Sequence, residues 1–231
     1  MSGATAKAVL SLRGVCKSYA GPRRRTVLRD IDFDLAPGEY VAITGESGVG
    51  KSTLLNLIAG LDRPDSGRVL LGGVDLATFR DDELTLLRRR HMGFVFQAFH
   101  LLPYLTLAQN VELPLLLNGM LSDEAAPKVA AVLDAVGLGD RGQSLPRELS
   151  GGEMQRIAIA RALVHAPALV LADEPTGNLD PESAAQVLAL LRERVKGGAA
   201  AGILVTHSAA AAKTADRIVV LSEQGLRPAR V

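Results

Sequence analysis

The stretch "YVAITGESGVGKSTLLNLIAG", residues Tyr40 to Gly60, decides the fold. It begins with a short and nearly all-apolar run, YVAITG, which is typical of a strand buried in a parallel sheet. A glycine-rich turn follows, and then KSTLLNLIAGL, which predicts a helix that ends near Ala59-Gly60. A buried strand, a glycine-rich loop and a helix in this order indicate an α/β protein with a mostly parallel sheet.

The loop itself, "GESGVGKST" from Gly45 to Thr53, matches the pattern G-x-x-x-x-G-K-[ST]. Its glycines let the backbone curl so that N–H groups point inward at a phosphate. Lys51 brings a positive charge to the β- and γ-phosphates, and the Ser52 hydroxyl is placed to bind Mg²⁺. The alternative is a glycine-rich turn with a stray lysine, which the strand before it and the helix after it disfavour. We therefore expect ATP and Mg²⁺ to bind here. The further candidate nucleotide contacts in this loop are Gly45, Glu46, Ser47, Gly48, Val49, Gly50 and Thr53.

A second buried strand, "LVLADE" from Leu169 to Glu174, ends in two carboxylates. Acids at the carboxyl end of a parallel strand stand where ligands bind in such sheets. Asp173 is spaced to hold Mg²⁺, and Glu174 can take a proton from an attacking water. The alternative is an ordinary strand end with solvated acids, and the phosphate-binding loop elsewhere in the chain argues against it.

Composition narrows the class of protein. The chain has 231 residues, and its 26 basic against 25 acidic side chains argue against a protein built to coat nucleic acid. A single cysteine, Cys16, excludes an internal disulfide and favours a reducing compartment. No uninterrupted run of about 18 apolar residues predicts a membrane span, and the N-terminus lacks the apolar core of a signal peptide. We therefore expect a soluble cytoplasmic protein.

The remaining pattern predicts how the chain is organised. Residues 29–35 alternate strictly, with Ile31, Phe33 and Leu35 on one face, which predicts a half-buried antiparallel strand. From Ala98 to about Val164 strand signals fade and Leu- and Ala-rich helical segments dominate. Buried strands then return, with a helix between them that Asp180 can cap. This order predicts a helical insertion within an α/β core.

The stretch "LSGGE", Leu149 to Glu153, adds a specific signal. Together with the phosphate-binding loop, "LADEPTGNLD" and "VTH", all in the same order, it resembles the ATP-binding subunits of ABC transporters. The resemblance implies an α/β P-loop NTPase fold: a RecA-like mixed-sheet core, an antiparallel β subdomain and an inserted α-helical subdomain. It implies a single domain over residues 1–231, with the core in 1–97 and 165–231 and the helical signature subdomain in 98–164.

The resemblance also implies roles for single residues. Tyr19 would stack on adenine, Gln97 would contact Mg²⁺ and the attacking water, and His207 would sense the γ-phosphate. Each has a plain structural alternative: a strand cap, a surface amide and a buried histidine. The implied catalytic residues are Glu174, His207, Gln97 and Lys51, and the implied metal contacts are Ser52, Gln97 and Asp173. The implied contacts to a nucleotide held by another chain are Ser150, Gly151, Gly152, Glu153 and Asp180, the last in a loop with Asn178 and Leu179 that crosses the dimer interface.

The implied mechanism pairs two copies head to tail, with ATP between Lys51 of one and Ser150 and Gly152 of the other. Membrane permease subunits are the implied further partner, at the cytoplasmic face of the inner membrane, and no nucleic acid partner is expected. "FHLLPYLTLAQNVELPLLL" and "LADEPTGNLD" resemble the subgroup that drives lipoprotein release and macrolide export. The alternatives are an ABC ATPase that acts on ribosomes or DNA, a small-molecule kinase, and a nucleotide-dependent scaffold.

Overall fold

The computed structural model describes residues 8–20, 25–197 and 200–229. Within these residues a six-stranded sheet has the strand order β10-β9-β3-β8-β7-β6. Its strands are β3 (Tyr40–Thr44), β6 (Met92–Phe96), β7 (Leu169–Asp173), β8 (Ala201–Val205), β9 (Arg217–Ser222) and β10 (Gly225–Pro228). Strands β3 and β6 to β9 run parallel, and β10 pairs antiparallel with β9. The predicted α/β fold with a mixed sheet is confirmed.

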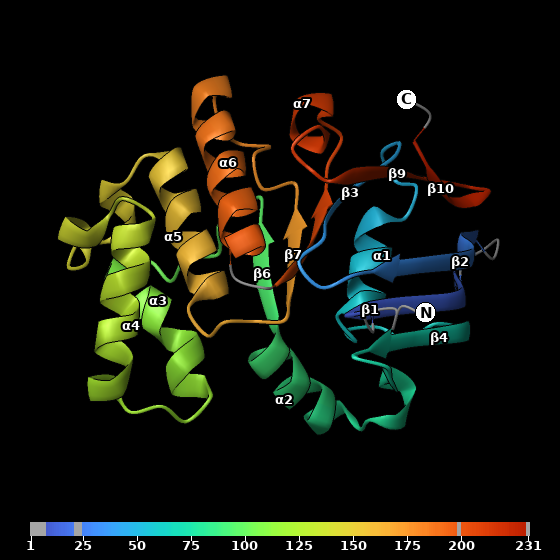
Figure 1. The fold of residues 1–231 in the computed structure, drawn as a ribbon, viewed down its shortest axis with the longest axis horizontal. Coiled ribbons are helices and arrows are strands. Elements are labelled where there is room, and N and C mark those ends of the chain that lie inside the picture. Colours follow the sequence, from blue (N-terminus) through green and yellow to red (C-terminus); the bar gives the residue numbers. More distant parts are fainter. Residues whose placement is uncertain (1–7, 21–24, 198–199, 230–231) are drawn as a thin grey trace, which may run out of the picture.

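A second, antiparallel sheet has the order β2-β1-β4-β5. It consists of β1 (Leu10–Tyr19), β2 (Arg25–Leu35), β4 (Ser66–Leu71) and β5 (Val74–Asp75). The alternation predicted for residues 29–35 is confirmed, because Ile31, Phe33 and Leu35 are buried whereas Asp32 and Asp34 between them are exposed. Figure 1 shows this sheet on the right-hand side of the molecule, beside α1 (Lys51–Ile58).

The large sheet is covered on both faces, and strand β7 shows why. Leu169 and Leu171 point into a core shared with α1 and the antiparallel sheet. Val170 and Ala172, on the opposite face, join a core shared with α5 (Gly151–Leu163) and α6 (Pro181–Gly197). Because successive side chains of a strand point to opposite faces, a strand buried on both sides must be apolar throughout.

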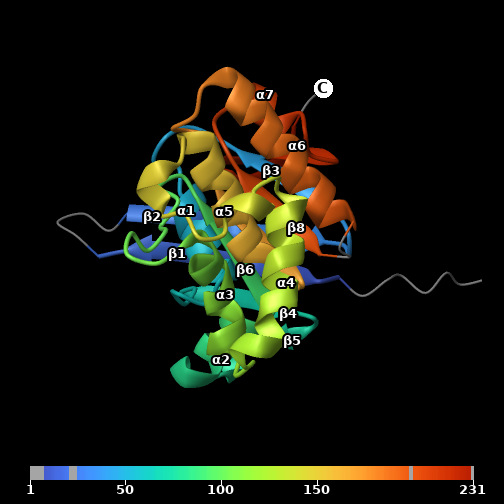
Figure 2. The same cartoon turned by 90° about the vertical axis from the view of Figure 1, so that its left-hand side faces the viewer.

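Residues between β6 and β7 form the helical part of the molecule. It contains α3 (Leu107–Leu117), α4 (Ser122–Ala135) and α5, which share a third core, and the short 3₁₀ turns η2 (Gly139–Arg141) and η3 (Pro146–Glu148). Figures 1 and 2 show α3 and α4 on the side of the sheet away from the antiparallel strands. The other elements are η1 (Leu76–Thr78), α2 (Asp81–His91) and α7 (Ala209–Ala212). The division of the chain at residues 97 and 165 stays a prediction.

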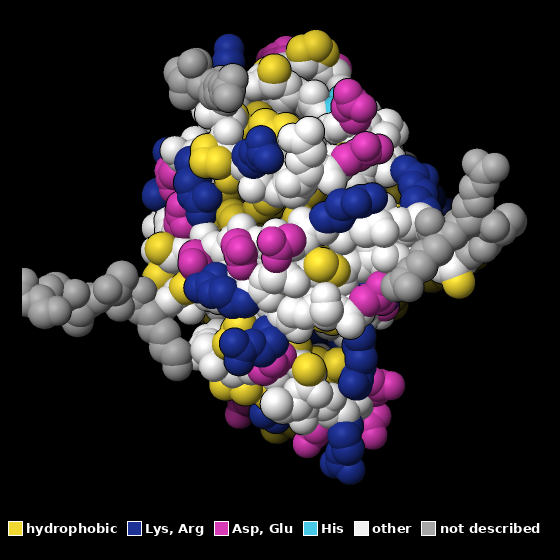
Figure 3. Space-filling model, turned by 90° about the vertical axis from the view of Figure 1, so that its right-hand side faces the viewer, with side chains coloured by type: hydrophobic (Ala, Val, Ile, Leu, Met, Phe, Trp, Pro, Cys, Tyr) yellow, Lys and Arg dark blue, Asp and Glu magenta, His cyan; other side chains and the backbone are white. Residues whose placement is uncertain are grey.

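The helix ends follow the sequence signals. Asp180 Oδ1 accepts hydrogen bonds from the N–H groups of Glu182 and Ser183, so the predicted cap of α6 is present. Gly197 is the last residue of that helix, and Gly198 lies outside the described residues. No helix in the described part of the chain is long and apolar enough to cross a membrane. On the face drawn in Figure 3, basic and acidic side chains are interspersed rather than gathered into one charged surface.

Candidate functional site

The phosphate-binding loop connects β3 to α1, as predicted. Gly45 and Gly50 have φ of +155° and +113°, in the region that favours glycine. A Cβ at Gly45 would lie 2.5 Å from the Leu221 carbonyl oxygen, and one at Gly50 would lie 2.5 Å from a methyl group of Val27. Both positions therefore need glycine for space as well as for conformation. Lys51 Nζ donates to the carbonyl oxygens of Gly45 (2.8 Å) and Glu46 (2.9 Å), so its charge lies at the centre of the loop.

Ser52 and Asp173 meet beside this loop. The Ser52 hydroxyl donates to Asp173 Oδ2 at 3.3 Å, across 121 positions of sequence. Burial raises the pKa of Asp173 and the Glu174 carboxylate adds to the rise, against the hydrogen bond from Ser52 and the charge of Lys51. A cation would stabilise the ionised form of this carboxylate.

The Ser52 hydroxyl and the Asp173 carboxylate fit Mg²⁺ only as part of a larger set of ligands. Among the described residues no group of three or more His, Cys, Asp or Glu side chains is placed to hold a metal. Mg²⁺ commonly takes one or two carboxylates and fills its remaining positions with water and phosphate oxygens. A serine hydroxyl and a half-buried carboxylate beside a phosphate-binding loop match that requirement.

Glu174 is held in a strained position directly after β7. Its φ of +46° lies in the left-handed region, which a residue with a side chain rarely adopts and which is frequent at functional sites. Its Oε2 accepts a hydrogen bond from Thr206 Oγ1 (3.1 Å), and its Oε1 accepts one from the His207 N–H (3.0 Å). His207 Nδ1 lies 2.8 Å from the same Oε1. One carboxylate is thus oriented by two residues that follow β8.

His207 connects the phosphate-binding loop to this carboxylate. It lines a pocket of about 950 Å³ together with residues 44–49 of the loop and residues 220–224 of the β9–β10 hairpin. It also lines a neighbouring pocket together with Glu174 and Leu179. A group that could remove a proton from water and a group that could contact a terminal phosphate are therefore adjacent.

Gln97 and Asn178 form a pair at the edge of the site. Gln97 Nε2 donates to Asn178 Oδ1 at 2.9 Å, and Asn178 Nδ2 donates to the Gln97 carbonyl oxygen at 3.1 Å. Gly177 gives the Gln97 amide its space, because a Cβ there would lie 2.7 Å from Nε2. The family resemblance implied a dimer-interface position for Asn178, and nothing in the sequence indicated this contact within the chain.

The residues from Leu149 to Glu153, here called the signature, lie at the start of α5, where Ser150 is the N-cap. Ser150 Oγ accepts from the Glu153 N–H (3.3 Å), and the Glu153 carboxylate accepts from the Ser150 N–H and hydroxyl, both at 2.8 Å. These hydrogen bonds from Ser150 lower the pKa of Glu153. Gly151 and Gly152 approach Leu179 and Ser183, next to Asp180. In Figure 1, strands β6 and β7 lie between α5 and α1, so one chain does not bring the signature and the phosphate-binding loop together.

Tyr19 lies at the end of β1 with 42% of its surface exposed. Its hydroxyl donates to Asp62 Oδ2 at 3.0 Å. Asp62 and Thr206 were missed by the sequence reasoning. Thr206 had a signal, since it directly follows a buried strand and precedes His207, but Asp62 had none, since it meets Tyr19 across 43 positions.

Three further histidines lie outside the motifs described above. His91 ends α2, His100 packs its ring 4.9 Å from that of Phe96, and His165 Nε2 lies 3.1 Å from the Met92 carbonyl oxygen.

Comparison with known proteins identifies the family. Residues 28–177 match the family described as ABC transporter. The chain belongs to this family. It is 49% identical over 216 residues to the lipoprotein-releasing system ATP-binding protein LolD of Pseudomonas syringae pv. tomato, covering 93% of this chain and 95% of that protein. It is 44% identical to the macrolide export ATP-binding/permease protein MacB of Rhodopseudomonas palustris, covering 94% of this chain and 33% of that protein.

A solved structure shows the same fold. The dimeric structure of MJ0796, a bacterial ABC transporter cassette, superposes with a TM-score of 0.84 at 36% identity, covering 96% of this chain and 99% of that one. A second structure of MJ0796, in a post-hydrolysis state bound to ADP and Pi, gives a TM-score of 0.83. The ABC cassette described here is therefore an ATP-binding subunit with ATPase activity, and the transport function is favoured over action on ribosomes or DNA.

Proposed function

We propose that this ABC cassette pairs head to tail with a second copy around two ATP molecules and drives a separate membrane permease. The observation that carries the proposal is the separation, within one chain, of the phosphate-binding loop from the signature at the start of α5. A head-to-tail pair presents the loop of one copy to the signature of the other. The MJ0796 cassette, which shares the fold, is described as a dimer.

The signature supplies half of a nucleotide site. At the start of α5, backbone N–H groups and the helix dipole favour an anion. The signature from Leu149 to Glu153 contains no lysine or arginine, so it lacks the compact charge that Lys51 gives to the phosphate-binding loop. We therefore assign Ser150, Gly151, Gly152 and Glu153 to the nucleotide of the partner copy, together with Asp180 at the start of α6.

Within one copy, the loop residues from Gly45 to Thr53 would hold the phosphates and Tyr19 would stack on the base. Ser52, Asp173 and Gln97 would hold Mg²⁺, which when bound neutralises phosphate charge. Glu174 would take a proton from the attacking water, because its carboxylate is fixed by Thr206 and His207 beside the phosphate pocket. His207 would contact the γ-phosphate, since it lines the pocket of the phosphate-binding loop.

We expect the permease to bind an apolar groove that is lined by Phe96, the residue before Gln97. The groove has a volume of about 400 Å³ and lies among α2, α3, α5 and β6. Its apolar lining includes Leu61, Met92, Phe94, Phe96, Leu117 and Ala162. Arg88, Arg89 and Arg161 also line it, so a short amphipathic segment that carries a carboxylate would fit. This would place the cassette at the cytoplasmic face of the inner membrane as a peripheral subunit.

We expect the permease to be of the lipoprotein-release and macrolide-export type, because the cassette is similar to the ATP-binding parts of that subgroup. LolD of Pseudomonas syringae pv. tomato is matched over 95% of its own length. The pyoverdine export protein PvdT of the same organism and MacB of Rhodopseudomonas palustris are matched over 33% of theirs, and both are named as ATP-binding/permease proteins. The ATP-binding part is thus similar whether or not a permease is part of the same chain.

The variant Glu174→Gln tests the proposal. It removes the base but keeps the size and most hydrogen bonds of the side chain, so ATP should bind, hydrolysis should fall by at least about a hundredfold and a dimer should accumulate. Size-exclusion chromatography with light scattering, with and without ATP, measures the dimer. Glu182→Gln, in the exposed first turn of α6, is the matched control and should hydrolyse ATP normally. Wild-type hydrolysis by Glu174→Gln, or an ATP-bound variant that stays monomeric, would contradict it.

The alternative of a ribosome- or DNA-directed ATPase is tested by purification from detergent-solubilised membranes. A permease should accompany the cassette, whereas ribosomes or DNA in the purified sample would support the alternative.

A further inference from the structure

We propose that Lys17 and Asp62 are positioning residues, which hold the Tyr19 ring in the orientation that stacks on the adenine base. The proposal rests on the proposed role of Tyr19 and concerns how the chain prepares that ring. The sequence assigned no role to either residue. Lys17 precedes Tyr19 by two positions on the same strand, whereas Asp62 meets Tyr19 only in the fold. Asp62 follows α1, whereas Lys17 and Tyr19 are in β1.

Asp62 binds Tyr19 and Lys17 at the same time. Its Oδ2 accepts the hydrogen bond of the Tyr19 hydroxyl at 3.0 Å, and its Oδ1 accepts one from Lys17 Nζ at 2.6 Å. Burial alone would raise the pKa of Asp62, but the hydrogen bonds from Lys17, the Arg63 N–H and Tyr19 outweigh it and lower the pKa. Asp62 is therefore an ionised acceptor at neutral pH, and hydrogen bonds to such an acceptor are stronger than those between neutral groups.

Lys17 acts on the face of the Tyr19 ring. Only 9% of its surface is exposed, and its ammonium group also donates to the Arg63 carbonyl oxygen at 2.7 Å. The same Nζ lies over the Tyr19 ring, 5.2 Å from the centroid, within the range of a cation–π interaction. With the hydroxyl fixed at one end and a cation over one face, the ring would receive a base on its opposite face.

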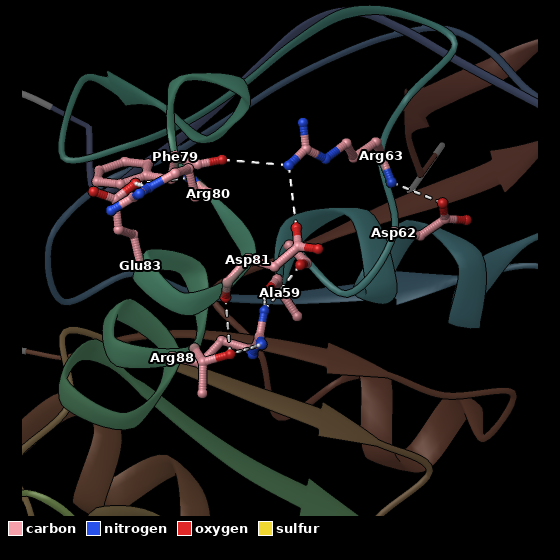
Figure 4. A network of polar contacts seen from close by, with 10 residues as sticks. Ala59, Asp62, Arg63, Phe79, Arg80, Asp81, Glu83 and Arg88 are labelled. Atoms are coloured by element: carbon pink, nitrogen blue, oxygen red, sulfur yellow. Dashed lines mark hydrogen bonds and ion pairs between the residues drawn. The ribbon is translucent and has the colours of Figure 1, made fainter.

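The segment that carries Asp62 is itself anchored. The N–H groups of Leu61 and Asp62 donate to the Asn56 carbonyl oxygen near the end of α1. Figure 4 shows Arg63 reaching the Phe79 carbonyl oxygen and the Asp81 carboxylate, at 3.3 and 3.2 Å. Asp62 is thus tied to α1, the helix that begins at Lys51 of the phosphate-binding loop.

This anchoring suggests what the arrangement does. A tyrosine at a strand end with 42% exposure would lose rotational freedom when a base stacks on it. If the ring is already held through Asp62 to the helix that follows the phosphate-binding loop, most of that loss has occurred before the nucleotide arrives. The Tyr19 ring, which would stack on the base, and the phosphate-binding loop would then keep a fixed spacing before the nucleotide binds.

Two ligands distinguish an effect on base binding from an effect on phosphate binding. ADP carries both, pyrophosphate carries phosphates alone, and neither requires hydrolysis, so calorimetry with Mg²⁺ gives a dissociation constant for each. We expect Tyr19→Phe, which removes only the hydroxyl, to weaken ADP binding about three- to tenfold and to leave pyrophosphate binding within about twofold. Asp62→Asn should also weaken ADP binding. The double variant should lose less ADP affinity than the product of the two single losses, because both changes act on the same hydrogen bond, between Tyr19 and Asp62.

The outcomes distinguish the proposal from the role on which it rests. If Tyr19→Ala weakens ADP binding but Tyr19→Phe and Asp62→Asn do not, stacking stands and the positioning role is wrong. If Tyr19→Ala leaves ADP binding unchanged, stacking is wrong and the positioning role fails with it. If Asp62→Asn weakens ADP and pyrophosphate equally, Asp62 supports the fold of the site and does not position the base.

Control variants guard against a loss of structure. Tyr104→Phe removes the hydroxyl of a tyrosine that is 93% exposed in another part of the fold, and should leave both dissociation constants unchanged. Lys17→Arg keeps a cation and should retain more ADP affinity than Lys17→Met at equal thermal stability. Equal ADP affinity of these two folded variants would rule out the contribution of the Lys17 charge.

Discussion

Gln97 and Asn178 are joined by two hydrogen bonds although 81 positions of sequence separate them. Gln97 follows Phe96, which lines the apolar groove between the helical part and the sheet. Asn178 precedes Asp180, the cap of α6, and its carbonyl oxygen lies near Gly151 of the signature. The pair therefore connects the proposed permease groove to the surface that we propose faces the second copy.

The variant Asn178→Ala tests that connection. Without the Asn178 amide, the Gln97 side chain loses its partner and should no longer be held in the position that we propose for contact with Mg²⁺. We expect kcat for ATP hydrolysis to fall about tenfold or more, because small displacements of a positioning group are costly to catalysis. ATP affinity of the monomer should stay within about twofold, since the phosphate-binding loop is untouched.

A graded control accompanies it. Asn178→Asp keeps an acceptor for Gln97 Nε2 but cannot donate to the Gln97 carbonyl oxygen, so its kcat should lie between those of the wild type and Asn178→Ala. Equal kcat for all three proteins would show that the pair does not serve hydrolysis.

Thr206 provides a second prediction, about the proposed catalytic carboxylate of Glu174. Thr206→Val keeps the shape of a side chain that is 1% exposed but removes the hydrogen bond to Glu174 and the acceptor for the Ser208 N–H. We expect kcat to fall about tenfold, because Glu174 loses one of the two residues that fix its carboxylate, and stability to fall by about 1–3 kcal/mol. Phosphate release and urea unfolding measure the two effects. Thr206→Ser keeps the hydroxyl and should retain most of the activity, and an active Thr206→Val would remove Thr206 from the mechanism.

The contrast between Glu174 and Asp62 illustrates what the sequence could predict. Strands buried on both faces are continuous apolar runs, so β3, β7 and β8 were predictable, and with them the carboxyl ends at which Lys51, Glu174 and His207 are placed. Local capping signals located α6 in the same way. Residues whose role is a contact made across the fold leave no such pattern.

Asp62 and Asn178 are the clearest examples. Asp62 is one of several acids near turns, and its contact with Tyr19 depends on how β1 packs against the end of α1. Asn178 was predicted to lie in a loop at a dimer interface, but its pairing with Gln97 depends on the adjacent placement of β6 and β7. Such pairs are set by tertiary packing, which spacing along a single chain does not encode.

A third prediction concerns acid stability. Partial burial would raise the pKa of Asp216, but hydrogen bonds from Lys196 and the Tyr40 N–H, together with the charges of Lys196 and Arg192, lower it. Because the pKa is lower in the folded than in the unfolded chain, the stabilisation is present above the unfolded value of about 4 and is lost as the pH falls through the folded value. Asp216→Asn should therefore be less stable than the wild type at pH 7 in urea unfolding.

The same measurement below pH 4 gives the control. The difference between the two proteins should shrink as the pH falls, because wild-type Asp216 then becomes protonated and uncharged as well. A difference that stays constant from pH 7 to pH 3 would mean that the Asp216 charge is not the source of the stabilisation.

Ser150 provides the fourth prediction, and its cap must be separated from its proposed contact with the partner's ATP. Ser150→Asp retains an N-cap for α5, since aspartate caps as well as serine, but adds a negative charge where a phosphate would approach. Monomer ATP affinity should stay within about twofold, whereas the ATP-dependent dimer in the Glu174→Gln background should be lost. Loss of ATP binding by the Ser150→Asp monomer would place the signature in the chain's own nucleotide site.

Mixing two inactive variants tests the head-to-tail arrangement directly. In a dimer of one Lys51→Ala chain and one Ser150→Asp chain, one nucleotide site combines both defects and the other combines two intact halves. If each site takes its loop from one copy and its signature from the other, mixing should restore hydrolysis at up to about a quarter of the sites. Each variant alone should stay inactive, because both of its sites carry the defect. A mixture as inactive as its components would contradict either the shared site or the independence of the two sites. A tandem fusion of two chains, with Lys51→Ala and Ser150→Asp in the same half and the other half unchanged, separates these cases. If the sites are shared, each site of the fusion carries one defect and no activity should return.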